Sequence, residues 1–224
     1  MTLNNFAGAY GNPVGVIVKS DSHIRYWAQI YNENETIAPV DPQEYAFGRY
    51  VRVEYPNIAQ PRHLIGVIYD SMLLNPSFGA LGPRLAADDS QRAIFSPDYL
   101  SERAVLIGII AIGSMEYLAN GEPASGSRGK EQGAPSFAVE AGAKVYPLTE
   151  SEIYAFHFYE DSSETAPALH ISYLSQMLSA PFSLLPQAAL RILDQLEPMF
   201  PGYQRHLKII RRNILWKQSI EPAR

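Results

Sequence analysis

The sequence of 224 residues contains no cysteine, and its apolar runs are short. Without cysteine the chain forms no disulfide and offers no thiolate ligand to a metal. Runs such as 104–113 are well below the ~20 residues that a membrane-spanning helix needs. The first residues, Met1-Thr-Leu-Asn-Asn-Phe6, lack the basic and apolar regions of a signal peptide. We therefore expect a cytoplasmic protein that folds around a hydrophobic core.

Motifs for nucleotide binding and nucleophilic catalysis are also missing. The pair Gly129-Lys130 is the nearest approach to a phosphate-binding loop, but such a loop needs a glycine five positions earlier and a serine or threonine after the lysine. Ala124 and Glu131 occupy those places. The sequence has no Gly-x-Ser-x-Gly motif either. We interpret residues 120–135, which are rich in Gly, Ser and Glu, as a solvated, mobile loop.

The five histidines form no metal-binding pattern. They are His23, His63, His157, His170 and His206, and no two have the i, i+4 spacing of a helical zinc pair. Only His157 lies beside carboxylates, those of Glu160 and Asp161, and we interpret this cluster as solvated. The sequence thus predicts no metal, no cofactor and no catalytic residue, while a hydrolase site assembled from distant residues stays open as an alternative.

Charge is distributed unevenly along the chain. The net charge is −5, yet residues 201–224 hold six basic residues against one acidic residue, a charge of +5. The other 200 residues carry −10, because 12 basic residues stand against 22 acidic ones. An acidic body is a poor platform for a phosphate backbone, whereas a short basic tail suits an acidic partner or a nucleic acid.

The pattern of apolar residues predicts a mainly β protein with α: a small closed antiparallel β-barrel over 1–150, then an acidic linker and a unit of about three helices over 151–224. Short β-branched runs separated by Gly, Pro and Asn indicate the strands. We expect strands at 14–19, 25–31, 50–55, 64–70, 103–112 and 137–141. From Leu169 onward the apolar period becomes helical, with breaks at Pro181, Pro186 and Pro201-Gly202.

The last predicted helix, 203–217, is the candidate binding site. Leu207, Ile210, Ile214 and Trp216 are expected to pack on the other helices. The basic residues Arg205, Lys208, Arg211, Arg212 and Lys217 are the predicted contacts with a protein or nucleic acid.

Five segments form a recurring β pattern: Val14-Gly-Val-Ile-Val18, Phe47-Gly-Arg-Tyr-Val-Arg-Val53, Leu64-Ile-Gly-Val-Ile-Tyr69, Val105-Leu-Ile-Gly-Ile-Ile110 and the closing stretch 135–147. In this order they resemble the HAS-barrel, the small barrel at the N-terminus of HerA-type DNA translocases, which is related to a barrel of rotary ATP synthase subunits. The resemblance covers about residues 10–148. It implies a barrel that helps to arrange subunits and has no catalytic residues, and the ATPase core that follows it in HerA proteins has no counterpart in this sequence.

These observations favour a non-enzymatic interaction module, which docks on a partner such as a HerA-like ATPase or a DNA-processing nuclease, and we expect it to form a homo-oligomer. A single-stranded nucleic-acid-binding protein is the alternative, because several of the 14 tyrosines fall in or beside the predicted strands and bases stack on exposed aromatic rings.

Overall fold

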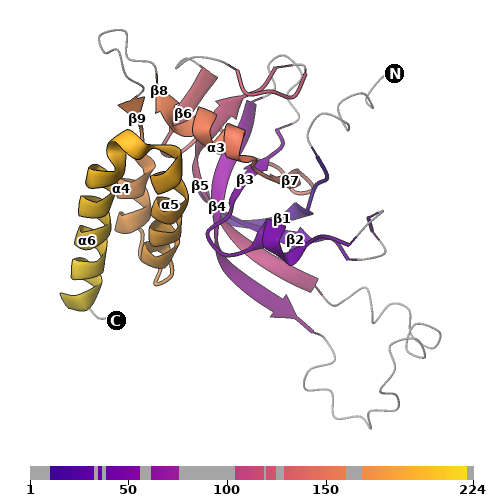
Figure 1. The fold of residues 1–224 in the computed structure, drawn as a ribbon. Coiled ribbons are helices and arrows are strands. Elements are labelled where there is room, and N and C mark those ends of the chain that lie inside the picture. The colour runs from indigo at the N-terminus through magenta and orange to yellow at the C-terminus, as the bar shows by residue number, and fades with distance from the viewer. Residues whose placement is uncertain are drawn as a thin grey trace.

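The protein is a mixed β and α fold in which a large antiparallel sheet lies against a layer of helices (Figure 1). The computed structural model describes residues 11–32, 35–36, 39–55, 62–75, 104–118, 120–124, 129–159 and 168–220. The strands are β1 (Gly15–Ser22), β2 (Arg25–Ile30), β3 (Tyr50–Val53), β4 (Arg62–Leu74), β5 (Ala104–Glu116), β6 (Lys130–Gln132), β7 (Lys144–Pro147), β8 (Phe158–Tyr159) and β9 (Ala168–Leu169). The α-helices are α3 (Glu150–His157), α4 (Tyr173–Ser179), α5 (Leu185–Met199) and α6 (Gln204–Ile220), with 3-10 turns at Pro42–Tyr45 and Pro201–Tyr203.

Six strands of the large sheet follow one another around a ring. Their order is β2-β1-β7-β3-β4-β5, and β2 pairs again with β5, while β6 extends the sheet from β5. Trp27 of β2 and Asp70 of β4 both lie opposite Gly108 of β5. A Cβ atom at Gly108 would lie 3.0 Å from the Cβ of Asp70, so the small residue permits this close approach of the strands.

Side chains that alternate along the strands build a core on each side of the sheet. Val51, Val53, Leu64 and Ile68 belong to a cluster on the inner side of the ring. Residues on the opposite side of the same strands, such as Tyr50, Ile65 and Val67, belong to a second cluster together with residues of the helices. Arg52, which lies on the same side of β3 as Tyr50, is also buried, so neither side of this strand is exposed.

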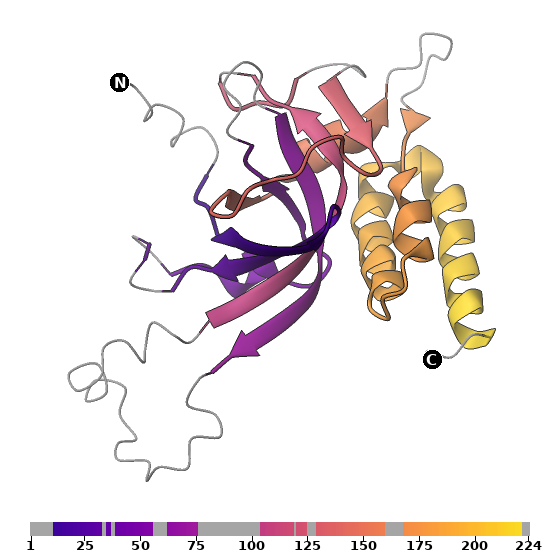
Figure 2. The same cartoon turned by 180° about the vertical axis from the view of Figure 1, so that it is seen from behind.

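Helices α4, α5 and α6 stack on one side of the sheet, as the two opposite views show (Figures 1 and 2). The turn before β3 fixes α5: Gly48 has φ of +83° and its carbonyl accepts a hydrogen bond from Gln195 at 2.8 Å. A Cβ at Gly48 would come within 2.6 Å of the Cβ of Arg191 on α5. Glycine is thus required here both by the backbone conformation and by the approach of the helix.

The predicted order of an antiparallel β region followed by helices is confirmed. The strand predicted at 137–141 is wrong: this segment has no ladder, and the strand lies later, at β7. Phe137 and Val139 are half-buried against the inner cluster, and Gly142, with φ of +87°, turns the chain before it joins β1. The short apolar alternation thus reflects side-chain packing without strand pairing.

Two further expectations need correction in the described part of the chain. Residues 130–132, predicted as mobile loop, form β6 on the edge of β5. From Leu169 onward the three expected helices appear as α4, α5 and α6, and they are preceded by α3, a helix that the sequence did not predict. Its start carries a capping box, in which the side chain of Thr149 accepts from the Glu152 amide and that of Glu152 accepts from the Thr149 amide. The loop at 76–89 and the acidic linker at 160–167 lie outside the described residues.

Candidate functional site

Helix α6 carries all five predicted contact residues, and it is anchored to the rest of the protein by one apolar side. It starts directly after the turn at Pro201–Tyr203 and contains neither glycine nor proline. Leu207 and Ile214 are its buried residues and join the core shared by helices and sheet. Because these residues are seven apart, they lie two turns apart on the same side of the helix.

Two of the predicted contact residues are engaged within the protein. Lys208 lies 3.5 Å from a carboxylate oxygen of Glu197 on α5. The guanidinium of Arg211 forms an ion pair with Asp194 and lies 3.9 Å from the other oxygen of Glu197. All four side chains are partly exposed, so these pairs add little stability. They nevertheless direct the two cations toward α5 and away from an external partner.

The other three cations are exposed to solvent. Arg205, Arg212 and Lys217 have no ion pair with any carboxylate of the described residues, and all three are classed with the exposed residues of the chain. They are therefore the predicted contacts that remain available to an acidic partner.

Trp216 lies on the outside of α6, which corrects the expectation that it packs on the other helices. Its side chain is 67% exposed, although Ile214, two residues earlier, is only 4% exposed. Two residues along an α-helix correspond to a rotation of about 200°, so Trp216 must face away when Ile214 faces inward. Ile209 and Ile220 are exposed to a similar degree, 58% and 57%.

These side chains share one side of the helix, which we call the outer α6 face. Most of them are three or four residues from another member, the spacing that brings side chains together on a helix surface, and Arg212 and Asn213 are adjacent in the sequence. The outer α6 face consists of Arg205, Ile209, Arg212, Asn213, Trp216 and Ile220. It combines three large apolar side chains with two unpaired arginines.

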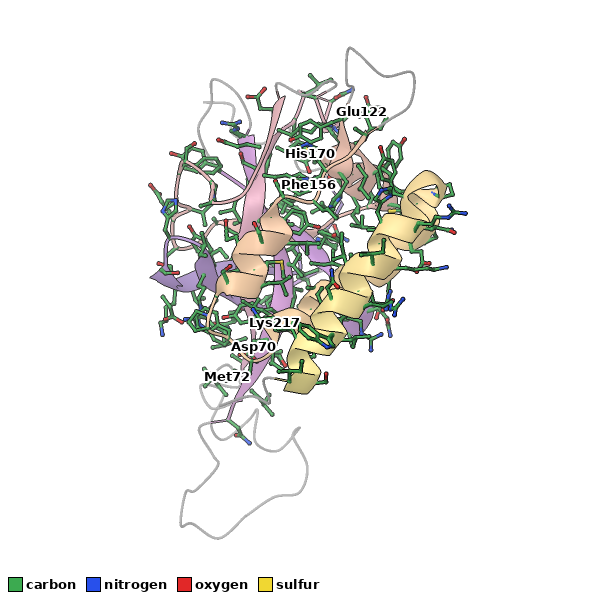
Figure 3. The ribbon with its side chains drawn as sticks, turned by 90° about the vertical axis from the view of Figure 1, so that its left-hand side faces the viewer. Asp70, Met72, Glu122, Phe156, His170 and Lys217 are labelled. Atoms are coloured by element: carbon green, nitrogen blue, oxygen red, sulfur yellow. The ribbon has the colours of Figure 1, made fainter. Side chains whose placement is uncertain are left out.

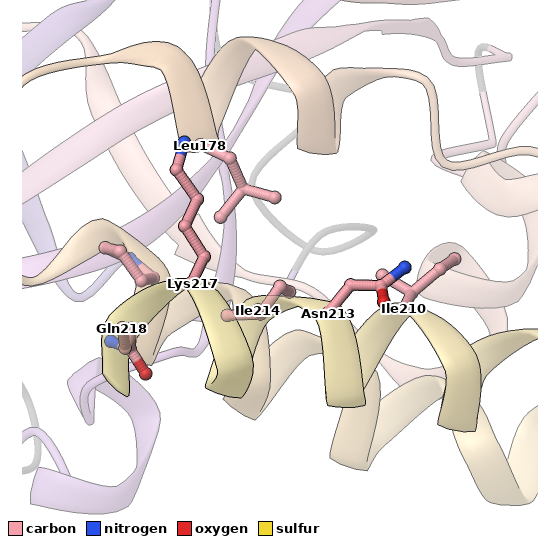
Figure 4. Close-up of a pocket in the computed structure, with 7 residues that line it drawn as sticks. Leu178, Ile210, Asn213, Ile214, Lys217 and Gln218 are labelled. Atoms are coloured by element: carbon pink, nitrogen blue, oxygen red, sulfur yellow. The ribbon is translucent and has the colours of Figure 1, made fainter. Parts of the chain in front are cut away.

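A groove borders the outer α6 face where α6 meets α4 and α5. Its volume is about 440 Å³, and it is lined by Leu178, Pro186, Ile210, Asn213, Ile214, Lys217 and Gln218. Figures 3 and 4 show Lys217 near the C-terminal end of α6, with its side chain extending toward Leu178 of α4. The groove thus has an apolar floor and a rim that offers an ammonium and two amide groups.

Buried polar groups hold the helices on the sheet. Tyr50 of β3, His157 of α3 and Tyr173 of α4 are fully buried. Nδ1 of His157 donates to the carbonyl of Ile153 at 2.7 Å, so its Nε2 accepts from the hydroxyl of Tyr173 at 2.8 Å. The hydroxyls of Tyr50 and Tyr173 lie 3.0 Å apart. Burial lowers the pKa of His157 to about 4 and keeps the ring neutral.

A second buried cluster joins β3 to α3. A guanidinium nitrogen of Arg52 lies 2.5 Å from a carboxylate oxygen of Glu152, and the group also lies over the ring of Tyr117, 5.1 Å from its centroid. His63 packs edge-on against Tyr117. Burial, and then the charge of Arg52, lower the pKa of His63 to about 3. Both shifted histidines are enclosed by protein, so neither is placed to exchange protons with a substrate.

Lys130 corrects the interpretation of its segment as a solvated loop. Its side chain is buried, and its ammonium donates to the carbonyls of Ala155, at 2.6 Å, and Phe158. These carbonyls lie at the C-terminal end of α3, where a positive charge is favourable. The lysine that resembled part of a phosphate loop therefore caps a helix.

A family model described as a domain of unknown function (DUF8166) matches residues 9–223. The chain belongs to this family. The match spans the ring of strands and helices α3 to α6 of this DUF8166 member. The comparison with curated proteins gives no match.

The described residues of this DUF8166 protein contain no group of three or more His, Asp or Glu side chains arranged to hold a metal, and Glu160 and Asp161 lie outside these residues. None of their helices has both the length and the apolar character for crossing a membrane.

Sequence reasoning selected α6 for its charge and overlooked its exposed apolar residues. Ile209 and Ile220 were not among the predicted contacts, and Trp216 was assigned to the core. The sequence contains a signal that identifies them. Ile209 and Trp216 are seven residues apart and so share one side of the helix, while Leu207 and Ile214, also seven apart, share the opposite side. Two apolar stripes on opposite sides of one helix indicate two packing partners, and the described part of the protein covers one of the two stripes.

Proposed function

We propose that this DUF8166 member is a non-enzymatic interaction module that binds another protein through the outer α6 face. The observation that carries the proposal is the exposure of Ile209, Trp216 and Ile220 between unpaired arginines, on a helix whose opposite side is anchored in the core. Exposed apolar residues are common singly, but a cluster rimmed by charge is typical of an interface. Trp and Arg are the residue types most enriched among those that dominate binding energy.

We further propose that the ring of strands is a small closed barrel of the HAS type. The pairing of β2 with β5 supports it, and so does the location of the HAS-like segments, since 47–53 leads into β3 and 64–69 lies in β4. In HerA-type translocases the barrel helps to arrange subunits around an ATPase ring. By this resemblance the partner is a HerA-like ATPase or an associated nuclease, and the barrel is the scaffold that presents α6.

The test is capture of a partner with variants of the full chain. Tagged protein is used to isolate partners from native lysate, the partner is identified by mass spectrometry, and its affinity is then measured with purified components. Trp216→Ala should weaken binding by about 10-fold or more, because the loss of an exposed aromatic anchor removes most of the apolar contact. Leu118→Ala is the matched control, since Leu118 is also exposed but lies at the end of β5, away from α6.

Equal binding by the wild type and Trp216→Ala would refute the assignment of the contact to α6. Nucleotide hydrolysis by the purified protein, lost on a substitution in this chain, would refute a non-enzymatic role.

Nucleic-acid binding is the second candidate, favoured by Trp216 beside Arg212 on a basic helix. Tyr26, Tyr50 and Tyr69 are buried, so these rings of the sheet are not available for stacking on bases. Binding of an oligo(dT) strand whose affinity falls steeply with salt and is lost in Arg205→Ala/Arg212→Ala would favour this candidate over a protein partner.

A further inference from the structure

The apolar residues of the outer α6 face are spaced like the seam of a coiled coil. Ile209, Asn213, Trp216 and Ile220 are separated by four, three and four residues, the alternation of a and d positions in a heptad repeat. In this register Asn213 and Ile220 occupy a positions, and Ile209 and Trp216 occupy d positions.

From this register, and resting on the proposed function, we propose that the partner's contact element is an acidic amphipathic helix that lies along α6 as the second strand of a short coiled coil.

The charges that flank the seam are the reason for proposing an acidic partner helix. Arg205 and Arg212 each precede an a position and so occupy g positions, while Lys217 follows Trp216 and occupies an e position. In coiled coils the e and g side chains lie beside the partner helix and set partner choice through their charges. Each charged residue at an e or g position over 205–217 is therefore positive, and a helix with Glu or Asp at its own e and g positions complements it.

The same charges disfavour a second copy of this chain as the occupant. In a parallel pair of α6 helices, Arg212 would lie against Lys217 of the other copy, and in an antiparallel pair the arginines at the g positions would lie against each other. Like charges that face each other across an interface oppose association. The acidic body elsewhere on the protein does not change this, because the flanking positions are local to the seam.

The groove beside α6 can also accommodate a side chain of the partner helix. Ile210 and Lys217, the two residues at e positions, both line it together with Leu178 of α4 (Figure 4). A helix on the outer α6 face can therefore lodge an apolar side chain in the groove while a carboxylate beside it reaches the ammonium of Lys217. Asn213 lines the groove and also lies in the seam, so it joins the two surfaces.

Asn213 at an a position has a further consequence for orientation. A buried asparagine at an a position specifies register, because its amide must find a polar partner across the seam. We therefore expect the bound helix to place a polar side chain opposite Asn213. The exposed seam from Ile209 to Ile220 is about 17 Å long, or about three helical turns, so the contact is short and its Kd is expected near 10 µM.

The test uses two synthetic 21-residue helical peptides with leucine at a and d positions and one asparagine at a central a position. One carries glutamate at its e and g positions, and the other carries lysine. Each is labelled at its N-terminus, and binding to the full-length protein is followed by fluorescence anisotropy. The blue shift of Trp216 emission is a second readout, because the other tryptophan, Trp27, is already buried.

We expect the glutamate peptide to bind at least 10-fold more tightly than the lysine peptide and to shift the emission of Trp216. Trp216→Ala should weaken its binding by about 10-fold. Arg212→Glu/Lys217→Glu should reverse the preference between the two peptides. Lys144→Glu/Lys19→Glu is the matched control, since it makes the same change in net charge at exposed sites on the sheet and should leave the preference unchanged.

Equal affinity of the two peptides, or no binding of the glutamate peptide at about 1 mM, would overturn the inference. A dimer in analytical ultracentrifugation that dissociates in Trp216→Ala would overturn it in favour of a second copy, and oligo(dT) binding at the same face would overturn it in favour of nucleic acid. If the peptides fail while Trp216 is still required for capture of a protein partner, the interaction module stands and only the acidic helix is wrong.

Discussion

Acidification from pH 7 to pH 5 should weaken the fold through two buried histidines. His157 and His63 have pKa values lowered to about 4 and about 3, chiefly because burial disfavours the charged ring. The charge of Lys130 adds to the lowering at His157, although the bond to the Ile153 carbonyl opposes it, and Arg52 adds to it at His63. Both rings are neutral in the folded protein at pH 5, whereas the unfolded chain, with a histidine pKa near 6.5, is protonated there.

The sign and size follow from this difference in bound protons. Since the unfolded state binds more protons between pH 6.5 and 4, the free energy of unfolding falls as the pH is lowered through this window. Each histidine should account for about 2 kcal/mol between pH 7 and pH 5, and the two together for about 4 kcal/mol. This is a large part of the ~5–15 kcal/mol that stabilises an ordinary domain.

The assay is urea unfolding followed by circular dichroism at pH 7, 6 and 5. His157→Gln should remove about half of the pH-dependent loss, because glutamine has a donor and an acceptor but no titrating group in this range. His63→Gln/His157→Gln should remove nearly all of it. His206→Gln is the control, since that ring lies on the exposed surface of α6.

The comparison rests on the change with pH within each variant, so a general destabilisation by the substitution does not affect it. Equal free energies of unfolding at pH 7 and pH 5 for the wild type would refute the reasoning, and so would a full loss retained in the double variant.

Two further predictions concern charges inside the fold. Arg52→Met should lower the free energy of unfolding by about 3–5 kcal/mol, because it leaves the carboxylate of Glu152 buried without its cation. Arg52→Met/Glu152→Met should lower it clearly less, since no unpaired charge is then buried. A double-mutant cycle of urea unfolding measures the difference, and equal losses for the single and double variants would contradict the prediction. Lys130→Met should cost about 2 kcal/mol, since it removes the donor of two partly buried carbonyls at the end of α3, while Lys144→Met, at an exposed position, should cost less than about 0.5 kcal/mol.

The strands could be predicted where their sequence is locally sufficient. Runs such as 64–70 and 104–112 combine β-branched residues with a single glycine, and they appear as β4 and β5. The pattern at 137–141 is similar in kind but only five residues long. Whether this segment forms a strand depends on tertiary contacts, namely the packing of Phe137 and Val139 and the turn at Gly142. A local sequence pattern does not contain this information.

The buried charged residues could not be predicted from the sequence, for a different reason. Arg52 and Lys130 are residues that are normally exposed, and each is buried because a partner distant in the sequence compensates its charge: Glu152 for the first, helix carbonyls for the second. Trp216 was misplaced for the converse reason, since a large aromatic residue is normally buried. Helical phase, which is available from sequence, identifies its exposure once Leu207 and Ile214 are known to anchor the helix.

The position of β7 between β1 and β3 bears on how the chain folds during synthesis. Val145 pairs with Gly15 on one side and with Val53 on the other, so β1 and β3 both pair with a strand that is synthesised much later, about 130 residues after Gly15 and about 90 after Val53. Until residue 147 has left the ribosome, β1 and β3 each present an unpaired edge, and the side of the sheet facing the later helices is uncovered. Such edges and apolar surfaces bind chaperones or other nascent chains. Slow translation before residue 147 should therefore promote aggregation more than a pause after it, when β7 has paired both edges although the side of the sheet facing the helices is still uncovered.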